Sequence, residues 1–473
     1  MRLGLSRFFW FMLVAVVLVT AAGVVLPRVY RIALLGSGYM AQTLCAGIFL
    51  SGRDFQDLKR ADLTGPGLGT LRLFTPSVDK EAKDVSAAAF GLARQTSIFR
   101  QGLGCTLIHH KTAASLRSET KGLFSSAPPM DGDAEWPAGS RVAAGDWPED
   151  VDAKAAIRAI DAIFSEPNPK RPRGSRALVV VYQGRIVAER YAPGFDAQMP
   201  LVGWSMSKTA TNALVGLRIG DGALALEDQR LMPQWRGASD PRGAITLDEL
   251  MRITSGLSFD ESTDDNLSDV SQMLFVQGNT AAFAAAKPLS YKPGTHWYYS
   301  SGTTNIIAGV LRETFDDDRD YLRFPHDRLF APLGMRTAVL APDASGTLMG
   351  ASFLYASARD WARLGLLFLQ DGKWQGEQLL PEGWAAYTTR PTPQSPNDEY
   401  GAQVWLKLKD SPGLGEPPMP EDAFYTMGFD GQVVAMVPSR ALVVVRLGLT
   451  PKGGGWEPAR DLAPLVNAFP EQR

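Results

Sequence analysis

Two hairpin signals at opposite ends of a long segment constrain the fold of this chain more than any other feature of its sequence. Each signal is a pair of runs rich in β-branched residues around a short turn. The pairs are Ala177–Tyr182 with Arg185–Tyr191 around Gln183–Gly184, and Gln432–Val437 with Ala441–Leu449 around Pro438–Arg440. Helical patterns fill the sequence between them. This order predicts an α+β domain with one antiparallel sheet whose strands come from both ends of the segment. Helices flank this sheet, and a mostly helical insertion separates its two hairpins.

Hydrophobic periodicity and cap residues predict the helices of this domain and one helix upstream of it. A capping box at Thr246–Glu249 opens a short helix that stops at Ser255–Gly256. The other expected helices are Val151–Phe164, a helix that starts at Ser205 and ends near Gly220, Gly302–Phe315, Ser357–Gln370, Trp456–Phe469, and upstream Glu81–Arg94 with Ser77 as its cap.

Composition argues against several classes of function. The chain has 473 residues, of which 45% are hydrophobic and 21% charged, as in an ordinary globular protein with a sizeable core. A net charge of −2 gives no sign of a nucleic-acid partner. The four histidines and two cysteines form no cluster with zinc-ligand spacing, so the sequence indicates no metal and no cofactor.

The chain opens with an almost unbroken apolar run, Phe8–Leu26, just long enough to cross a hydrocarbon core of about 30 Å. Apolar residues continue past the small residues Ala21–Gly23, which favours an uncleaved signal anchor over a cleaved signal peptide. Arginines flank the run on both sides, so charge alone leaves its orientation open. We expect residues 1–30 to hold the chain in the cell membrane by a single N-terminal pass, with the remainder on the periplasmic side. If they are cleaved, the protein would be periplasmic or secreted.

The rest of the chain divides into three expected parts. Residues 31–124 form a small appended region, residues 125–150 are rich in Pro, Gly, Ser and Ala as in a linker, and residues 151–473 form the main domain. The small region carries both cysteines, Cys45 and Cys105. An exported protein would join such a pair in a disulfide, whereas a cytosolic protein would keep both reduced.

The stretch Ser205–Lys208 indicates chemistry. If Ser205 opens a helix, Lys208 lies on the same face and its amine can reach the serine hydroxyl. A serine needs such a base to act as a nucleophile, and burial can lower a lysine pKa until the neutral amine is available. The same spacing recurs in charged surroundings at Ser77–Lys80 and Ser118–Lys121, whereas the copy at Ser205 lies between apolar residues. An ordinary serine N-cap is the alternative interpretation.

Three motifs in this order resemble the active site of the serine β-lactamase and penicillin-binding-like superfamily. They are S-x-x-K at Ser205 and Lys208, Y-x-N or Y-x-S at Tyr299–Ser301 within Pro293–Gly302, and K-T-G or H-x-G in the stretch Gly428–Gln432. Tyr355–Gly365 and Leu380–Trp384 resemble the class C-type branch of esterases, D-amino-acid peptidases and 6-aminohexanoate-dimer hydrolases. The resemblance covers roughly residues 150–470 and implies a β-lactamase/transpeptidase-like fold.

The resemblance also implies a mechanism. A small ester or amide would be cleaved through an acyl-enzyme on Ser205, with Lys208 as the base. Tyr299, with a lowered pKa, would relay the proton to the leaving group. The backbone N–H groups of Ser205 and Gln432 would form the oxyanion hole, and Gly431 would let the substrate approach that strand.

The expected binding residues depart from the family pattern. Ser301 stands where the best-studied members have Asn, and Phe429 stands where Lys or His is usual. Phe429 cannot hold a substrate carboxylate and Asp430 would repel one, so neutral substrates are expected. Tyr298 is an alternative to Tyr299, one residue short of the family spacing. A catalytically silent penicillin-binding-like module that binds a cell-wall or peptide ligand is the alternative function, and the oligomeric state stays open.

Overall fold

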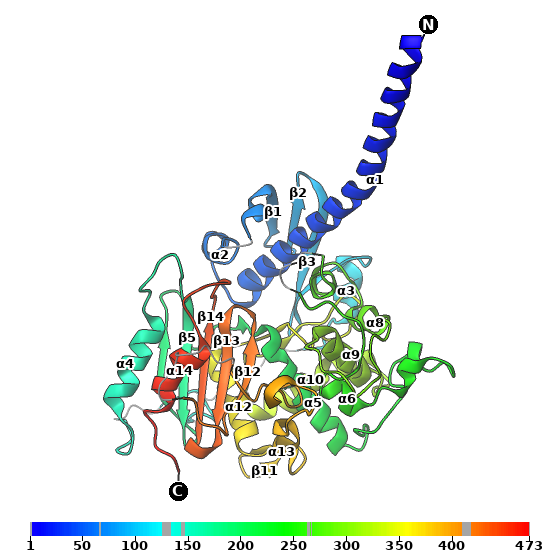
Figure 1. Ribbon diagram of the computed structural model, residues 1–473. Helices are drawn as coiled ribbons and strands as arrows, with labels where there is room; N and C mark the ends of the chain where they lie inside the picture. Colours follow the sequence, from blue (N-terminus) through cyan, green and yellow to red (C-terminus); the bar gives the residue numbers. More distant parts are fainter. Residues whose placement is uncertain are drawn as a thin grey trace.

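The computed structural model describes residues 2–65, 68–124, 134–142, 147–262, 265, 267–408 and 418–472. A long N-terminal helix, α1 (Arg2–Cys45), begins away from the body of the protein and ends against a small sheet (Figure 1). This sheet lies beside a larger α+β domain, and both predicted hairpins belong to that domain.

The larger domain is built on a five-stranded antiparallel sheet with the order β12-β13-β14-β5-β6. Its strands are β5 (Ser175–Tyr182), β6 (Arg185–Tyr191), β12 (Phe424–Gly428), β13 (Gln432–Val437) and β14 (Leu442–Gly448). The two hairpins meet where β14 pairs with β5, for example at Val444 and Val180. The predicted antiparallel sheet joined from both ends is therefore confirmed.

Helices cover both faces of this sheet, and its central strands are therefore buried on both sides. Alternate residues of β5 point to opposite faces. Val180 joins the buried cluster of α4 (Ala153–Phe164) and α14 (Pro458–Val466), whereas Val179 joins the cluster that contains α12 (Ala358–Leu369).

The insertion between the hairpins is mostly helical, as predicted. Besides α12, its α-helices are α5 (Ser207–Gly220), α6 (Leu247–Met251), α7 (Asp269–Phe275), α8 (Thr280–Ala285), α9 (Ser301–Arg312), α10 (Asp318–Pro325), α11 (Ala331–Leu333) and α13 (Trp384–Thr389). Its short strands are β7 (Leu201–Val202), β8 (Val339–Leu340), β9 (Leu354–Ala356), β10 (Lys373–Trp374) and β11 (Glu377–Gln378). The capping box at Thr246 and Glu249 opens α6, and Ser357 caps α12, as their sequence positions indicated.

The upstream region contains a four-stranded sheet where the sequence predicted a helix at Glu81–Arg94, and that prediction is wrong. Its elements are α2 (Phe55–Ala61), β1 (Phe74–Asp79), β2 (Asp84–Ala89), β3 (Leu92–Arg100), β4 (Gly104–Leu107) and α3 (Ala113–Glu119). Phe90 and Gly91 both have positive φ, at 50° and 76°, as a tight hairpin turn requires. Burial of the strand faces against α1 overrides the helix propensity of the alanines.

The second half of α1 belongs to the folded body. Met40, Ala41 and Leu44 are buried in the same cluster as core residues of the larger domain. A disulfide joins Cys45, the last residue of α1, to Cys105 in β4. The helix end is thus covalently fixed to the small sheet.

Part of the predicted linker is tied to the larger domain. Arg363 of α12 donates hydrogen bonds to the carbonyl oxygens of Pro137 and Gly139 at 3.0 and 2.7 Å. Residues 125–133 and 143–146 of that segment lie outside the described residues.

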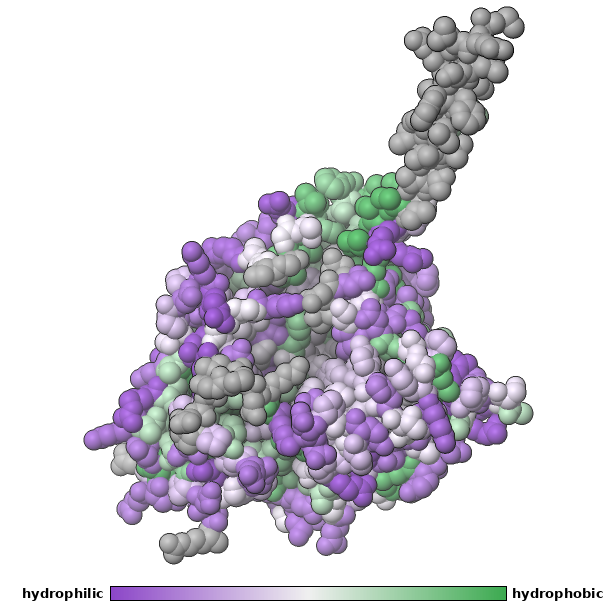
Figure 2. Space-filling view, viewed as in Figure 1, coloured by the Kyte–Doolittle hydropathy of each residue, from purple (hydrophilic) through white to green (hydrophobic). Residues whose placement is uncertain are grey.

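Hydrophobic residues gather on the surface where α1 leaves the body (Figure 2). Val25, Leu26, Val29 and Tyr30 of α1 are each more than half exposed. Within the described part of the chain, the stretch Val25–Leu50 is long and apolar enough to cross a membrane, but 56% of its most apolar window is buried inside the protein, as in a core helix.

Candidate active site

Ser205 lies in a tight turn, Trp204–Met206, that leads directly into α5. Trp204, just before it, has a φ of 49°, a left-handed conformation that typically costs about 1–3 kcal/mol in a non-glycine residue. Packing of the Trp204 ring against Phe353 and Phe429, with centroids 5.8 Å away in each case, holds this turn. In the described residues no side-chain hydrogen bond caps the start of α5, so the interpretation of Ser205 as an N-cap is wrong.

Lys208 is buried and points at Ser205. Its amine donates hydrogen bonds to the Ser205 hydroxyl at 3.1 Å and the Ser301 hydroxyl at 2.9 Å, and approaches the carbonyl oxygen of Ala351 at 3.4 Å. Burial lowers the pKa of Lys208 to about 8, although the nearby carboxylate of Glu261 opposes this shift. A substantial fraction of this amine is therefore neutral in mildly alkaline solution and able to accept a proton.

Tyr299 contacts the same two residues. Its hydroxyl is hydrogen-bonded to the Ser205 side chain, and the Lys208 amine lies 4.8 Å from its ring centroid. Burial, assisted by the charge of Glu261, raises the pKa of Tyr299 above its ordinary value. The expected lowering of this pKa is therefore wrong, and Tyr299 is a neutral phenol. Tyr298, the alternative, is 46% exposed and is absent from the described lining of the cavity that contains Ser205.

Glu261 is a member of this cluster that the sequence analysis missed. Its carboxylate accepts hydrogen bonds from the backbone N–H of Ser301, at 2.7 Å, and from the Ser301 hydroxyl. Ser301 thereby connects Glu261 to Lys208. Burial raises the pKa of Glu261, and Lys208 opposes the shift. The available sequence signal was the acidic pair Asp260–Glu261, which gives no indication of a partner.

The turn after β12 places different residues beside Ser205 from those expected. A Cβ on Gly428 would lie 2.1 Å from the carbonyl oxygen of Gly203, so the end of β12 runs against the chain that carries the serine. Of the described residues, Gly428 and Phe429 line the cavity that contains Ser205, whereas Gly431 and Gln432 do not. The expected oxyanion role of Gln432 and Gly431 therefore needs correction.

Gln432 and Gly431 have structural roles instead. The amide of Gln432 donates to the carbonyl oxygen of Gly448 at 2.6 Å and accepts from its N–H at 2.9 Å, which ties β13 to the end of β14. The carbonyl oxygen of Gly431 accepts a hydrogen bond at 2.8 Å from Arg446, a fully buried residue of β14. Gln432 begins β13, one strand further along than its sequence position suggested, because the short β12 has no strong strand pattern in the sequence.

Asp430 lines the cavity near charged groups of the N-terminal region. Burial raises the pKa of Asp430 to about 7, while Arg176 opposes this shift and Asp62 adds to it. At a pH near 7 the Asp430 carboxyl is therefore uncharged in about half of the molecules. Its repulsion of an anionic substrate is weaker than the sequence suggested. Arg176 itself is paired with Asp62 at 2.6 Å.

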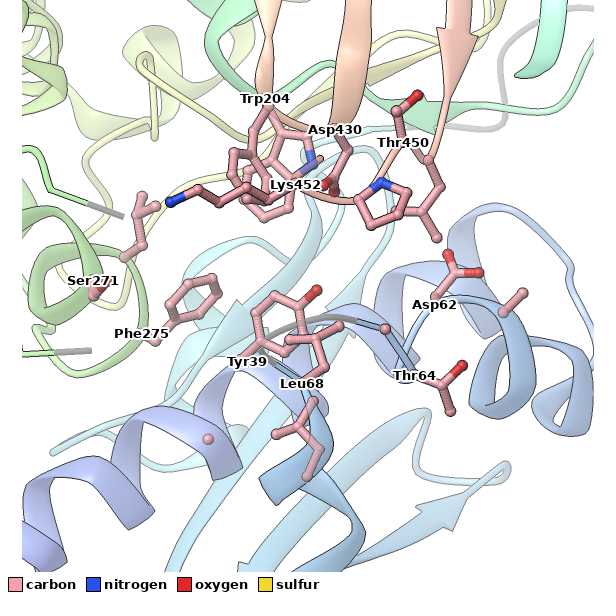
Figure 3. Close-up of a pocket in the computed structure, with 18 of the residues that line it drawn as sticks. Tyr39, Asp62, Thr64, Leu68, Trp204, Ser271, Phe275, Asp430, Thr450 and Lys452 are labelled. Carbon is pink, nitrogen blue, oxygen red and sulfur yellow. The ribbon is translucent and has the colours of Figure 1, made fainter. Parts of the chain in front are cut away.

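The cluster opens into a large cavity between the larger domain and the N-terminal region. Tyr39 of α1 faces Trp204 and Asp430 across this space, with Phe275 at its side (Figure 3). In the described residues no group of three or more His, Cys, Asp or Glu is placed to hold a metal ion. The two other S-x-x-K copies have exposed serine and lysine residues.

The five-stranded sheet with a helical insertion, and Ser205 beside the buried Lys208 at the start of α5, are features of the serine β-lactamase and penicillin-binding-like superfamily. A family model described as Beta-lactamase matches residues 160–465. The chain therefore belongs to the beta-lactamase family.

Solved structures share this fold at low sequence identity. A family VIII carboxylesterase has a TM-score of 0.54 at 13% identity, covering 69% of this chain and 98% of its own. A protein from Bacillus anthracis described as a 6-aminohexanoate-dimer hydrolase has a TM-score of 0.51 at 21% identity, covering 62% and 78%. A penicillin-binding protein homologue from Caulobacter crescentus has a TM-score of 0.50 at 15% identity, covering 69% and 98%. Comparison with curated protein sequences finds no match.

Proposed function

We propose that this protein is a serine hydrolase that cleaves neutral esters or amides through an acyl-enzyme on Ser205. The observation that carries the proposal is the buried Lys208 amine, 3.1 Å from the Ser205 hydroxyl, with a pKa lowered to about 8. Burial of a lysine amine against a serine lowers the stability of the fold, and in a module that only binds a ligand no function would offset this cost. The carboxylesterase among the solved structures supports an ester substrate by analogy of fold.

In the proposed mechanism the Ser205 hydroxyl attacks the substrate carbonyl and its proton passes to the neutral Lys208 amine. The negative charge that develops on the carbonyl oxygen is stabilised by the backbone N–H groups of Ser205 and Phe429. This assignment replaces Gln432 with the residue that lies on the cavity side of the turn after β12.

The proposed role of Tyr299 follows from its neutral phenol. Tyr299 donates its proton to the leaving group, and Lys208, now an ammonium, gives a proton back to Tyr299. The ammonium near the ring also stabilises any charge on the phenol oxygen. A water molecule then hydrolyses the acyl-enzyme by the reverse transfers. Ser301 and Glu261 hold the Lys208 amine in position.

We also propose that α1 anchors the protein in the cell membrane with the hydrolase domain on the periplasmic side. The apolar run Phe8–Leu26 and the disulfide between Cys45 and Cys105 support this location. Fractionation of cells that express the full chain checks it, and recovery in the cytosolic fraction with free thiols would contradict it.

A fluorophosphonate probe tests the proposed function directly. It should add to one residue of the full chain, and peptide mass spectrometry should place the adduct on Ser205. An intact protein without an adduct, together with no turnover of a chromogenic short-chain ester, would favour the silent binding module.

The Glu261→Gln substitution should move the acid limb of the pH–rate profile to lower pH. The carboxylate raises the pKa of Lys208, so its removal leaves burial unopposed and the amine loses its proton more readily. The profile of kcat/KM against pH for a short-chain ester measures the shift. Glu382→Gln, in a loop outside the cluster, is the matched control, and a limb that moves to higher pH would contradict the role of Glu261.

Phe429→His should raise β-lactam turnover relative to ester turnover. Phe429 is 49% exposed and lines the cavity, where it offers no charge or hydrogen bond to a substrate carboxylate. A charge-assisted hydrogen bond contributes about 1.5–3 kcal/mol, or roughly ten- to a hundredfold in rate. Among the cations that could take this role instead, Arg390 and Lys407 are not among the described residues that line the cavity, whereas Lys452 and Arg176 are, and Arg176 is paired with Asp62. Nitrocefin hydrolysis by the unsubstituted protein at the rate of its best ester would show this argument to be wrong.

A further inference from the structure

The cavity beside Ser205 is far larger than a small ester requires. Its volume is about 2240 Å³, whereas sites for small molecules usually measure roughly 300–1,000 Å³. Ser205, Glu261 and Tyr299 line one part of it, and residues of α1 and the small sheet line another. Two regions far apart in the sequence thus enclose one continuous space.

Aromatic rings connect the two parts of this cavity. Tyr39 of α1 packs edge-on against Phe275 with centroids 5.4 Å apart. Phe275 and Trp204, which precedes the serine, also line the cavity. Both pack on Phe353, a buried ring that does not itself line the cavity, at 6.1 and 5.8 Å between centroids. Phe429 continues the series on the far side of Trp204. The wall from α1 to Ser205 is therefore apolar along this path.

The end of the cavity away from Ser205 has an exposed apolar rim. The six mouth residues, all lining the cavity, are Leu26 (65% exposed), Val29 (54%), Tyr30 (52%), Leu73 (48%), Phe90 (79%) and Leu92 (69%). They come from α1 and from the β1–β3 end of the small sheet, where Figure 2 shows hydrophobic surface. A gathering of large exposed apolar side chains on a soluble surface marks a membrane or a partner.

The position of the rim in the chain identifies what covers it. Leu26 is both a mouth residue and the last residue of the apolar run Phe8–Leu26, and α1 continues through it without a break. Arg28 and Arg31, exposed at the same level, suit the phosphate zone of a bilayer, because long basic side chains reach the interface. The mouth therefore lies at the bilayer surface when α1 spans the membrane.

We propose that the substrate is a long-chain acyl ester drawn from the bilayer, whose acyl chain enters through the mouth residues and lies in the cavity while its carbonyl reaches Ser205. This inference rests on the proposed serine hydrolase function and specifies its substrate class. The apolar Phe429 and the aromatic path fit a hydrocarbon chain better than the carboxylate of a β-lactam. The hydrolysis itself consumes one water and yields the fatty acid and the alcohol.

Chain-length preference tests the proposal. The full chain, reconstituted in phosphatidylcholine vesicles, should cleave p-nitrophenyl palmitate with a higher kcat/KM than p-nitrophenyl butyrate. Ala33→Trp narrows the cavity from α1, and it should lower the palmitate-to-butyrate ratio at least about tenfold, the size of effect that one or two lost apolar contacts produce. Ala162→Trp, on the exposed face of α4, should leave the ratio unchanged.

The mouth is tested by a second pair of variants. The double substitution Phe90→Asp with Leu92→Asp should lower the same ratio at least about tenfold, because charged residues oppose contact with the bilayer. Tyr291→Asp, at an exposed tyrosine outside the cavity lining, is the matched control. A preference for butyrate, or a ratio that neither Ala33→Trp nor the mouth variant changes, would overturn the proposal.

A binding measurement separates this inference from the proposed function. The Ser205→Ala full chain is placed in vesicles that contain a phosphatidylcholine with a diazirine at the end of one acyl chain. Illumination should label cavity residues such as Leu35 and Phe275. Labelling without any ester turnover by the unsubstituted protein would contradict the hydrolase and keep the lipid site. Turnover of butyrate without labelling inside the cavity would contradict the lipid site and keep the hydrolase.

Discussion

Ser205→Ala is expected to remove ester hydrolysis almost completely, by roughly 10⁴–10⁶-fold in kcat, as loss of the nucleophile does in other serine hydrolases. Its folding stability should change by no more than about 1 kcal/mol. The reason is that the Ser205 hydroxyl bonds to Lys208 and Tyr299 but caps no helix, and Lys208 keeps Ser301 as an acceptor. Turnover of p-nitrophenyl butyrate and calorimetric unfolding measure the two quantities.

Two other serines provide controls for this result. Ser118→Ala alters an exposed copy of the same motif and should change neither quantity. Ser207→Ala should show the opposite pattern, since its buried hydroxyl accepts a hydrogen bond from the N–H of Leu354 at 3.0 Å and donates to the carbonyl oxygen of Trp204 at 2.7 Å. Loss of these bonds should cost about 1–3 kcal/mol of stability and leave the nucleophile in place. If Ser205→Ala retains turnover, the site assignment fails.

Lys208→Met is expected to lower kcat/KM by roughly 10²–10⁴-fold, the usual contribution of a general base. With a pKa of about 8, the Lys208 amine is protonated and inactive below that pH and neutral above it. The activity of the unsubstituted protein should therefore rise with pH up to about 8 and then level off. Methionine fills the buried site without a charge, so the variant should fold and lose this limb.

The profile between pH 6 and pH 10 measures the effect of Lys208→Met. Asp430→Asn is the control, because Asp430 also titrates near neutral pH, with a pKa of about 7. A limb near pH 8 that persists in Lys208→Met but disappears in Asp430→Asn would assign the dependence to Asp430 and contradict Lys208 as the base.

The parts of the fold that the sequence predicted are those with strong local signals. The hairpin around Gln183–Gly184 and the capping box at Thr246 have fixed local geometry, so short-range patterns identify them. The hairpin around Phe90–Gly91 was missed because its alanine-rich strands have weak β propensity and acquire strand structure only by packing on α1.

The candidate site divides in the same way. Ser205 and Lys208 are three residues apart, and the start of a helix brings them together whatever the rest of the chain does. Glu261 and Phe429 share the cavity with Ser205 only through tertiary contacts across long sequence separations, which spacing does not encode. The raised pKa of Tyr299 likewise depends on burial, which the motif does not encode, so the motif alone suggested the wrong direction for this pKa.

The continuity of α1 has a kinetic consequence. The segment that would cross the bilayer and the segment that lines the cavity are one helix, and the disulfide at Cys45 fixes its end to the small sheet. Pro27 allows the helix to bend but does not lengthen it. Under the proposed anchoring, a continuous helix with about 1.5 Å of rise per residue would hold the active site at a fixed height above the membrane, whereas a flexible tether would not. An enzyme anchored as proposed would search for its ester in the two dimensions of the membrane, and its rate would follow the mole fraction of that ester. Diluting the ester with inert lipid would then slow the reaction, whereas diluting the whole suspension would not.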